Sequence, residues 1–164
     1  RRIMDNTQDT HEAFLQLAVA IAREHMQAGA GGPFGAVIVR NGAVIGRGWN
    51  QVTSDHDPTA HAEVSAIRDA CRTVANFSLA GSVIYTTCEP CPMCLSAIWW
   101  ARIETIYFAS DRDDAARIGF DDAALYREVS LALPDRQLPL VRYQIADADQ
   151  LMEDWLKKED KIPY

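Results

Sequence analysis

The chain has 164 residues, of which 48% are hydrophobic and 24% are charged, and its formal net charge is −7. This length and apolar content predict one domain spanning 1–164 rather than two domains. No apolar run approaches the roughly 20 residues of a membrane span, so no membrane contact is expected. The acidic balance and the lack of a Lys/Arg cluster argue against a nucleic-acid partner and favour a small or neutral ligand.

The cysteines are unevenly placed along the chain. Three of the four fall within the seven residues from Cys88 to Cys94. This clustering favours metal or redox chemistry in a reducing compartment over a disulfide scaffold, and we therefore expect a cytoplasmic protein. The first four residues lack an apolar signal region, and we assign no targeting role to them.

The first predicted element is a helix near the start of the chain. Asp9 with Glu12 forms a capping-box pattern, and apolar residues recur at helical spacing over 14–22. Gly29 is placed to end this helix. The segments 34–39 and 43–49 that follow are rich in β-branched residues and flank an Asn-Gly pair, which predicts a β-hairpin.

Helices and strands alternate in the rest of the chain. Asp57 and Pro58 predict the start of a helix covering 60–74. Further strands are expected at 82–86, 103–109 and 141–145, and helices after Pro92, within 111–129 with a break at Gly119, and around 151–156. The alternation predicts an α/β fold with helices on both faces of a sheet, and the early hairpin makes that sheet mixed.

One histidine and two cysteines have the spacing of metal ligands. His61 and Glu63 would point about 200° apart in mid-helix, but in the first turn both can reach a target beyond the helix end. Cys91 and Cys94 share one helix face because they are three residues apart, and a helix N-terminus favours thiolates. One imidazole and two thiolates suit Zn²⁺ with its fourth position open to water. Glu63 is then a spare carboxylate for general acid–base catalysis.

Other interpretations of these cysteines remain open at this point. An isolated C-x-x-C pair is often redox-active or structural, and Cys88, Cys91 and Cys94 also imitate an iron–sulfur run. Such a run requires a fourth cysteine, which 95–98 does not supply. A closed structural zinc site could recruit Cys71. We expect Cys88 to be a buried neutral thiol, since a third thiolate would overcharge the site.

The order H-x-E followed by P-C-x-x-C is typical of zinc nucleobase deaminases. The sequence resembles the cytidine deaminase superfamily and, within it, the bacterial guanine deaminases. The motifs that carry the resemblance are GGPFGAVIV at 31–39, DPTAHAEVSAIR at 57–68, YTTCEPCPMCLSAIWWAR at 85–102, AARIGFDD at 115–122 and the terminal Tyr164. The resemblance implies a three-layer α/β/α cytidine-deaminase-like fold with a five-stranded mixed sheet.

The resemblance also implies which residues bind a purine base. The matching positions are Phe34, Asn50, Ala62, Phe120, Asp122 and Tyr164. Without it, Phe34 could be plain core, Asn50 a turn residue, and Asp121 or, by preference, Asp122 the N-cap of the following helix. The resemblance further implies a homodimer in which about 140–164 is exchanged between subunits.

The activity implied by the resemblance is hydrolysis of guanine to xanthine and ammonia. Aminotriazines share guanine's N–C(NH₂)–N unit, so a side activity on them is expected. The alternatives are a tRNA adenosine deaminase and a cytosine deaminase. Outside the deaminases, a binding module with structural zinc and a redox protein would fit the cysteines alone.

Overall fold

A four-stranded mixed sheet forms the centre of the computed structural model, which describes residues 6–164. Its strands are β1 (Gly35–Arg40), β2 (Ala43–Trp49), β3 (Ser82–Cys88) and β4 (Thr105–Ser110), in the order β2-β1-β3-β4. β1 pairs antiparallel with β2 and β3, whereas β3 and β4 are parallel. The first four residues, to which no targeting role was assigned, lie outside the described part.

The predicted hairpin joins β1 to β2. Asn41 and Gly42 have φ angles of 51° and 76°, which is the positive-φ pair of a two-residue type I′ turn. The turn matches the right-handed twist of the strands and therefore sets their register. The hairpin prediction is confirmed, and the sheet is mixed as expected.

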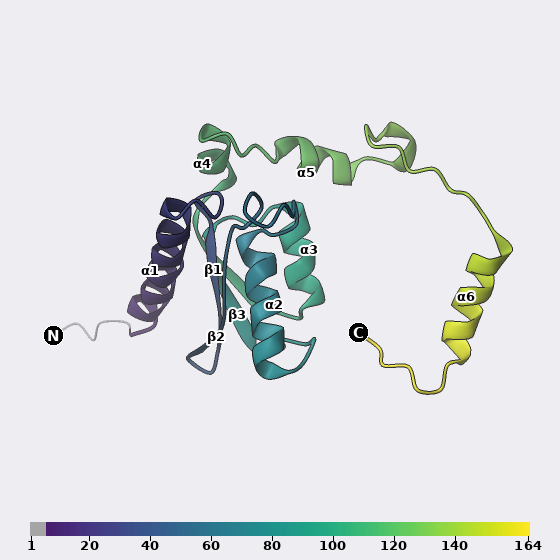
Figure 1. Cartoon of the computed structure of the whole chain (residues 1–164), viewed down its shortest axis with the longest axis horizontal. Helices are drawn as coiled ribbons and strands as arrows, with labels where there is room; N and C mark the ends of the chain where they lie inside the picture. The colour runs from purple at the N-terminus through teal and green to yellow at the C-terminus, as the bar shows by residue number, and fades with distance from the viewer. Residues whose placement is uncertain (1–5) are drawn as a thin grey trace.

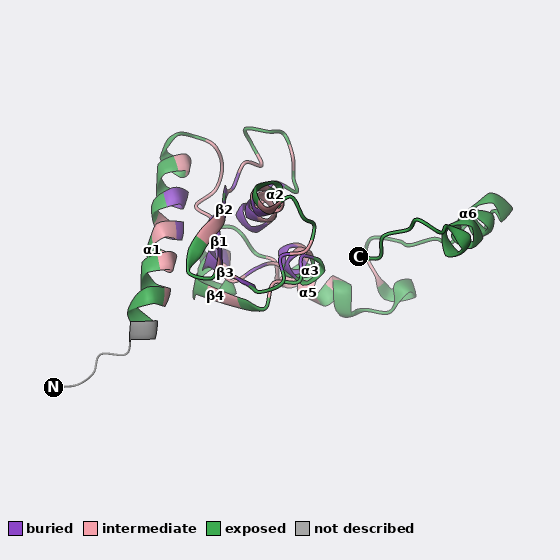
Figure 2. Ribbon diagram, turned by 90° about the horizontal axis from the view of Figure 1, so that it is seen from below, coloured by how far each residue is buried: buried purple, intermediate pink, exposed green. Residues whose placement is uncertain are grey.

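Helices cover both faces of this sheet. α1 (Asn6–Gln27) lies on one face, and α2 (Ala62–Val74) and α3 (Pro92–Trp100) lie on the other, as Figures 1 and 2 show. β1 divides its side chains between the two layers: Val37 and Val39 pack towards α1, while Ala36 and Ile38 join the cluster under α2 and α3. Because successive side chains of a strand point to opposite faces, this buried strand is apolar along its length. The α/β layer prediction is confirmed.

α2 lies directly against β2 because two glycines leave room for its backbone. A Cβ at Gly48 would lie 2.1 Å from the carbonyl oxygen of Ala62 and 2.3 Å from the nitrogen of Ala66. A Cβ at Gly46 would lie 2.6 Å from the carbonyl oxygen of Ala66. The first turn of α2 is therefore fixed by backbone contact with the sheet, and this turn carries the candidate site.

Two predicted helix starts are wrong by a few residues. α1 begins at Asn6, so Asp9 lies within its first turn and the predicted capping box there does not form. α2 begins at Ala62, whereas the sequence predicted an Asp57 cap and a first turn at Pro58. Asp57 instead accepts a hydrogen bond from the backbone nitrogen of Thr59 at 2.8 Å and shapes a turn before the helix. Carboxylates stabilise both motifs, which is why the sequence alone did not separate them.

The C-terminal part of the chain leaves the body of the molecule. It contains α4 (Arg112–Arg117), α5 (Ala123–Ser130), a 3₁₀ turn (Leu133–Asp135) and α6 (Ala146–Lys157). After α5 the chain runs away from the sheet, and α6 stands apart from it (Figure 1). The strand predicted at 141–145 is absent, since this segment has no neighbouring strand within its own chain. Within residues 6–164 the sheet thus has four strands, not five.

No helix in the described part is both long enough and apolar enough to cross a membrane.

Candidate active site and metal centre

Two helix N-termini meet at the predicted metal ligands. His61 is the N-cap of α2, Cys91 is the N-cap of α3, and Cys94 lies one turn into α3. Pro92 at the first turn of α3 fixes where that helix starts. Nδ1 of His61 lies 3.7 Å from Sγ of Cys91 and 3.5 Å from Sγ of Cys94. The three donor atoms lie within 4.8 Å of one another, and they are the one such group of three ligands in residues 6–164.

The donor set fits tetrahedral zinc. With Zn–S bonds of about 2.3 Å and Zn–N bonds of about 2.0 Å, the nitrogen–sulfur edge of a tetrahedron is about 3.5 Å. The two nitrogen–sulfur distances at His61 match this edge. A neutral imidazole with two thiolates also balances the charge of Zn²⁺. Three ligands from the chain are the number found in catalytic zinc sites, whereas structural sites usually have four.

Hydrogen bonding within the cluster prepares a thiolate. The bond from Cys94, followed by that from His61, lowers the pKa of Cys91 to about 4 against the opposing effect of burial. The hydrogen bond between Cys94 and Cys91, together with burial, raises the pKa of Cys94. The hydrogen bond with Cys91 raises the pKa of His61. A thiolate is the form of cysteine that binds metals.

Glu63 supplies a carboxyl group beside the cluster. It lies in the first turn of α2 and is 8% exposed. Its Oε2 accepts a hydrogen bond from Sγ of Cys94 at 3.4 Å. Burial raises the pKa of Glu63, because the charged form loses its hydration. A carboxyl group with a raised pKa holds its proton more readily, which suits a general acid–base catalyst.

The other two cysteines lie outside the cluster. Sγ of Cys88 is buried and donates to the carbonyl oxygen of Asp111 at 3.6 Å, and burial raises the pKa of its thiol to about 11. Sγ of Cys71 donates to the carbonyl oxygen of Phe77 at 3.8 Å. Cys88 is thus a neutral thiol. Its exclusion from the cluster argues against an iron–sulfur run, and that of Cys71 argues against a closed structural site.

Residues 8–110 match the family profile of the cytidine and deoxycytidylate deaminase zinc-binding region. This match covers more than half of the chain and includes all three residues of the cluster. The chain belongs to this family. Family membership and the donor set of His61, Cys91 and Cys94 together identify zinc as the metal of this deaminase fold.

Individual relatives extend the similarity along the whole chain. Guanine deaminase of Bacillus subtilis (strain 168) is 46% identical over 154 residues, which cover 94% of this chain and 99% of the relative. An X-ray structure of guanine deaminase from Bacillus subtilis has a TM-score of 0.91 and 45% identity, covering 94% of this chain and 98% of that one. A tRNA-specific adenosine deaminase of Aquifex aeolicus is 32% identical over 90% of this chain and 94% of its own length.

Two of the residues that the cytidine-deaminase resemblance assigned to the base are in ring contact. The centroids of Phe34 and Phe120 are 4.9 Å apart and their planes meet at 87°, an edge-to-face arrangement. Asn50 is 7% exposed, and its Oδ1 accepts hydrogen bonds from the backbone nitrogens of Gly32 and Val52, both at 3.2 Å. The acceptor of this amide is therefore occupied by the loops around it, and its NH₂ group is the part left to meet a ligand.

Asp122 occupies the N-cap position of α5 without capping it. Its side chain makes no capping hydrogen bond, whereas Oδ1 of Asp121 accepts from the backbone nitrogen of Ala123 at 2.9 Å. The helix-capping interpretation thus applies to Asp121. Burial raises the pKa of Asp122, and the negative charge of Cys91 raises it further. Asp122 is free to bind another group.

The last two predicted residues differ in placement. Ala62 is buried as the first residue of α2, between His61 and Glu63. Tyr164 is 76% exposed, and its ring centroid lies 6.4 Å from that of Phe77 and 6.2 Å from that of Trp100. The structure therefore brings Ala62 to the zinc cluster but not the Tyr164 of the same chain.

A network at the turn before Cys91 was not predicted. Nε and Nη2 of Arg112 donate to Oε1 of Glu89 at 3.2 and 3.0 Å, and the backbone nitrogen of Arg112 donates to Oε2 at 3.1 Å. The guanidinium carbon also lies 3.9 Å from the centroid of the Tyr126 ring. The Tyr126 hydroxyl donates to the carbonyl oxygen of Pro90 at 2.9 Å. The only sequence signal was the adjacency of Glu89 to the cysteine motif.

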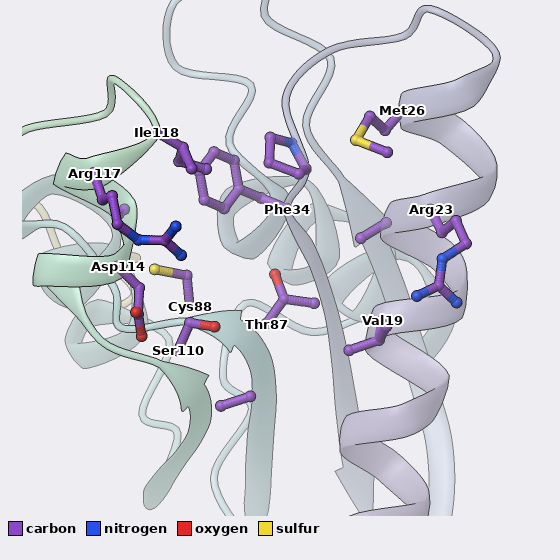
Figure 3. A pocket seen from close by; sticks show the side chains of 14 residues that line it. Val19, Arg23, Met26, Phe34, Thr87, Cys88, Ser110, Asp114, Arg117 and Ile118 are labelled. Carbon is purple, nitrogen blue, oxygen red and sulfur yellow. The ribbon is translucent and has the colours of Figure 1, made fainter.

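A cavity of about 370 Å³ lies between α1 and α4, beside the predicted base-binding residues. Figure 3 shows Phe34 and Cys88 among its walls, with Arg23 and Arg117 towards its two sides. None of the three zinc ligands lines it. This cavity therefore shares Phe34 with the candidate site but is separate from the metal centre.

Proposed function

We propose that the protein catalyses hydrolytic deamination of guanine, bound as the free base, to xanthine and ammonia. The observation that carries the proposal is the three-ligand cluster with a spare buried carboxyl group at 3.4 Å from Cys94. The similarity to guanine deaminase over almost the whole chain supports guanine as the substrate. The residues that the resemblance assigns to the base have the chemistry that a flat purine with donors and acceptors requires.

His61, Cys91 and Cys94 would hold the zinc ion through Nδ1 and the two sulfurs. When bound, zinc supplies a Lewis acid that acidifies water. Glu63 accepts the proton of the attacking water, which adds to C2 of guanine. Glu63 passes this proton to the ring nitrogen, then takes the remaining proton of the new C2 hydroxyl and delivers it to the exocyclic amine, and the C2–N bond breaks with release of ammonia. The buried position of Glu63 next to the ligands supports this role.

The residues assigned to the base offer complementary contacts to guanine. Phe34 and Phe120 give an aromatic wall for the ring. The NH₂ group of Asn50 can donate to a carbonyl or ring-nitrogen acceptor, since its oxygen is already engaged. The backbone N–H of Ala62 is one of the unpaired donors at the start of a helix. Asp122 can accept from the N–H groups of the base.

The C-terminal segment supports a homodimer. The exposed apolar side chains of α6 are Leu151, Met152, Trp155 and Leu156, and those of α3 are Leu95, Trp99 and Trp100. Faces of this kind require cover, and neither is covered within one chain. The high TM-score to the guanine deaminase crystal structure extends over almost the whole chain and so includes the segment that leaves the body. We therefore infer that 1–164 is one domain whose segment from about 140 is exchanged with a second copy.

This exchange would complete the fold and the site. β4 is an edge strand, so 141–145 of the partner could pair with it as the fifth strand. Tyr164 of the partner could then close the base pocket, because the Tyr164 of the same chain lies elsewhere. A small-molecule reaction in a chain with free cysteines fits a cytoplasmic protein.

A substrate panel tests the proposed reaction. Ammonia release is measured with guanine, cytosine, an aminotriazine and adenosine-containing tRNA, with zinc content determined on the same sample. We expect stoichiometric zinc, rapid conversion of guanine to xanthine and slower turnover of the triazine. The similarity to tRNA-specific adenosine deaminases gives the alternative. Inosine formation in tRNA without ammonia from guanine would overturn the proposal; the net charge of −7 argues against that outcome.

A further inference from the structure

The position of α5 is set by very few contacts. This helix carries Asp122 at its N-cap and has no buried residue. Core packing therefore does not hold Asp122 in place. Among the hydrogen bonds of residues 6–164, the one that joins a side chain of α5 to the zinc-binding body runs from the Tyr126 hydroxyl to the carbonyl oxygen of Pro90, at 2.9 Å.

The acceptor of this bond belongs to the peptide group that precedes a zinc ligand. The carbonyl of Pro90 and the nitrogen of Cys91 share one planar unit. Holding the oxygen fixes the plane of this peptide, and hence the direction in which the side chain of Cys91 leaves the backbone. The hydrogen bond from Tyr126 therefore acts on the peptide group that sets the orientation of Cys91.

Arg112 joins the same turn from α4. Its three hydrogen bonds to Glu89 hold the residue before Pro90, and its guanidinium carbon lies 3.9 Å from the centroid of the Tyr126 ring. The attraction between this cation and the face of the aromatic ring stabilises the position of Tyr126. The turn from Glu89 to Cys91 is therefore held from two helices at once.

Tyr126 also fixes the N-terminal end of α5, where Asp122 lies. Its backbone nitrogen donates to the carbonyl oxygen of Asp122 at 3.0 Å, and residues four apart lie on the same helix face. A displacement of Tyr126 would therefore move Asp122 relative to Cys91. The phenol lies where the zinc ligand turn and the candidate base-binding helix meet.

We propose that Tyr126, braced by Arg112, is a positioning residue that orients Cys91 towards zinc and Asp122 towards the base. The part that concerns Cys91 requires only the metal cluster, and the part that concerns Asp122 rests on the proposed deamination of guanine. Hydrogen-bond partners behind metal ligands typically contribute about 10- to 100-fold in metal affinity or activity. Sequence reasoning could not find this link, because α4, α5 and the cysteine turn meet only in the fold.

The test removes one hydroxyl. In Tyr126→Phe the aromatic ring over Arg112 is kept and the bond to Pro90 is lost. The zinc dissociation constant of the full-length holoenzyme is measured by competition with a chelator, and KM and kcat are measured with guanine. We expect zinc binding to weaken about 10-fold and KM to rise about 3- to 10-fold, with a smaller change in kcat. Tyr107→Phe is the matched control, because the Tyr107 ring stacks on His11 and its hydroxyl makes no hydrogen bond within the described part.

The outcomes separate the two proposals. Zinc affinity and KM in Tyr126→Phe equal to those in Tyr107→Phe would overturn the positioning role, whatever the substrate. Weaker zinc binding in Tyr126→Phe, together with a wild-type chain that is inactive on guanine, would keep the role at Cys91 and reject the proposed function. Arg112→Gln gives a second approach if Tyr126→Phe unfolds: it should weaken zinc binding in the same direction, and unchanged binding there would also contradict the proposal. In the double variant the losses should not add, since both residues act on one turn.

Discussion

Glu63 is the residue on which the proposed chemistry depends, and its position follows from two neighbours. Gly48 lets α2 approach the sheet, His61 caps the helix, and Glu63 follows in the first turn. The carboxyl group is therefore buried beside the two sulfurs without being one of the three ligands. A carboxyl group in this environment can take up and release a proton during one turnover.

Replacement of Glu63 separates metal binding from proton transfer. Glu63→Gln keeps the shape of the side chain and removes its ability to accept a proton. We expect zinc content to stay stoichiometric while kcat for guanine falls by about 10²- to 10⁴-fold. Elemental analysis and an ammonia assay on one preparation measure both. His61→Ala, which removes a ligand, should lose zinc and activity together; near-normal turnover in Glu63→Gln would reject its role.

Gly48 offers a prediction about stability. An alanine there would place Cβ 2.1 Å from the Ala62 carbonyl oxygen, so α2 would have to move away from β2. We expect Gly48→Ala to lower the free energy of unfolding by at least about 2 kcal/mol, as overpacking does, and to weaken zinc binding. Urea denaturation measures the first effect. Gly81→Ala is the control, because Gly81 has φ 79° and open space around it, so only backbone strain of about 1–2 kcal/mol is expected.

At the scale of helices and strands, the sequence predicted most of the body correctly. The Asn41-Gly42 turn, the apolar alternation of β1 and the helix start at Pro92 all have strong local causes. The metal cluster was predictable for the same reason, since each pair of residues lies at the start of one helix. The residues at which α1 and α2 begin were less predictable, because an aspartate can cap a helix or close a turn. Asp122 was ambiguous until Asp121 was seen to occupy the capping role.

The carboxylate of Glu128 binds the backbone of the segment that follows α5. Its Oε1 accepts from the backbone nitrogen of Leu138 at 2.9 Å and its Oε2 from that of Gln137 at 3.1 Å. Nε of Arg136 donates to the carbonyl oxygen of Leu131 at 3.1 Å. These bonds fold the connection back onto the end of α5 and so set the direction in which the remaining chain departs.

This connection should respond to acid. The hydrogen bonds from Leu138 and then from Gln137 lower the pKa of Glu128 below its ordinary value of 4.5. A lowered pKa in the folded chain means that the bonds stabilise the turn above pH 4.5 and are lost as pH falls through the folded value. We expect the amide NMR signals of Gln137 and Leu138 to titrate together below pH 4.5. Glu128→Gln should abolish this titration, and a midpoint at or above 4.5 would contradict the assignment.

At the scale of the whole molecule, the single chain leaves apolar side chains of α3 and α6 exposed and β4 unpaired on one side. The strand predicted at 141–145 had a correct local pattern but no neighbour within the chain. Local sequence indicates that a segment favours a strand, whereas a strand forms only when another strand supplies its hydrogen bonds. The position of Tyr164 was unpredictable on the same ground, since it depends on where the departing segment finds cover.

Mixing two inactive variants tests the exchange of this segment. One chain carries Glu63→Gln with an intact C-terminus, and the other has Glu63 but lacks Tyr164. In an exchanged dimer, the hybrid has one complete site, made of Glu63 from one chain and Tyr164 from the other. Unfolding and refolding the mixture should restore about a quarter of wild-type activity, because half of random dimers are hybrids with one of two sites complete. No recovery, with dimers present by light scattering, would place Tyr164 in the site of its own chain.

The exposure of the residues after α5 has a consequence for how the protein works at low abundance. On the proposed exchange, a working site is the product of an encounter between two molecules. Specific activity should then fall on dilution below the dissociation constant of the dimer, and in that range output would follow the square of protein concentration. A cell could silence such an enzyme by reducing its amount modestly, without an inhibitor.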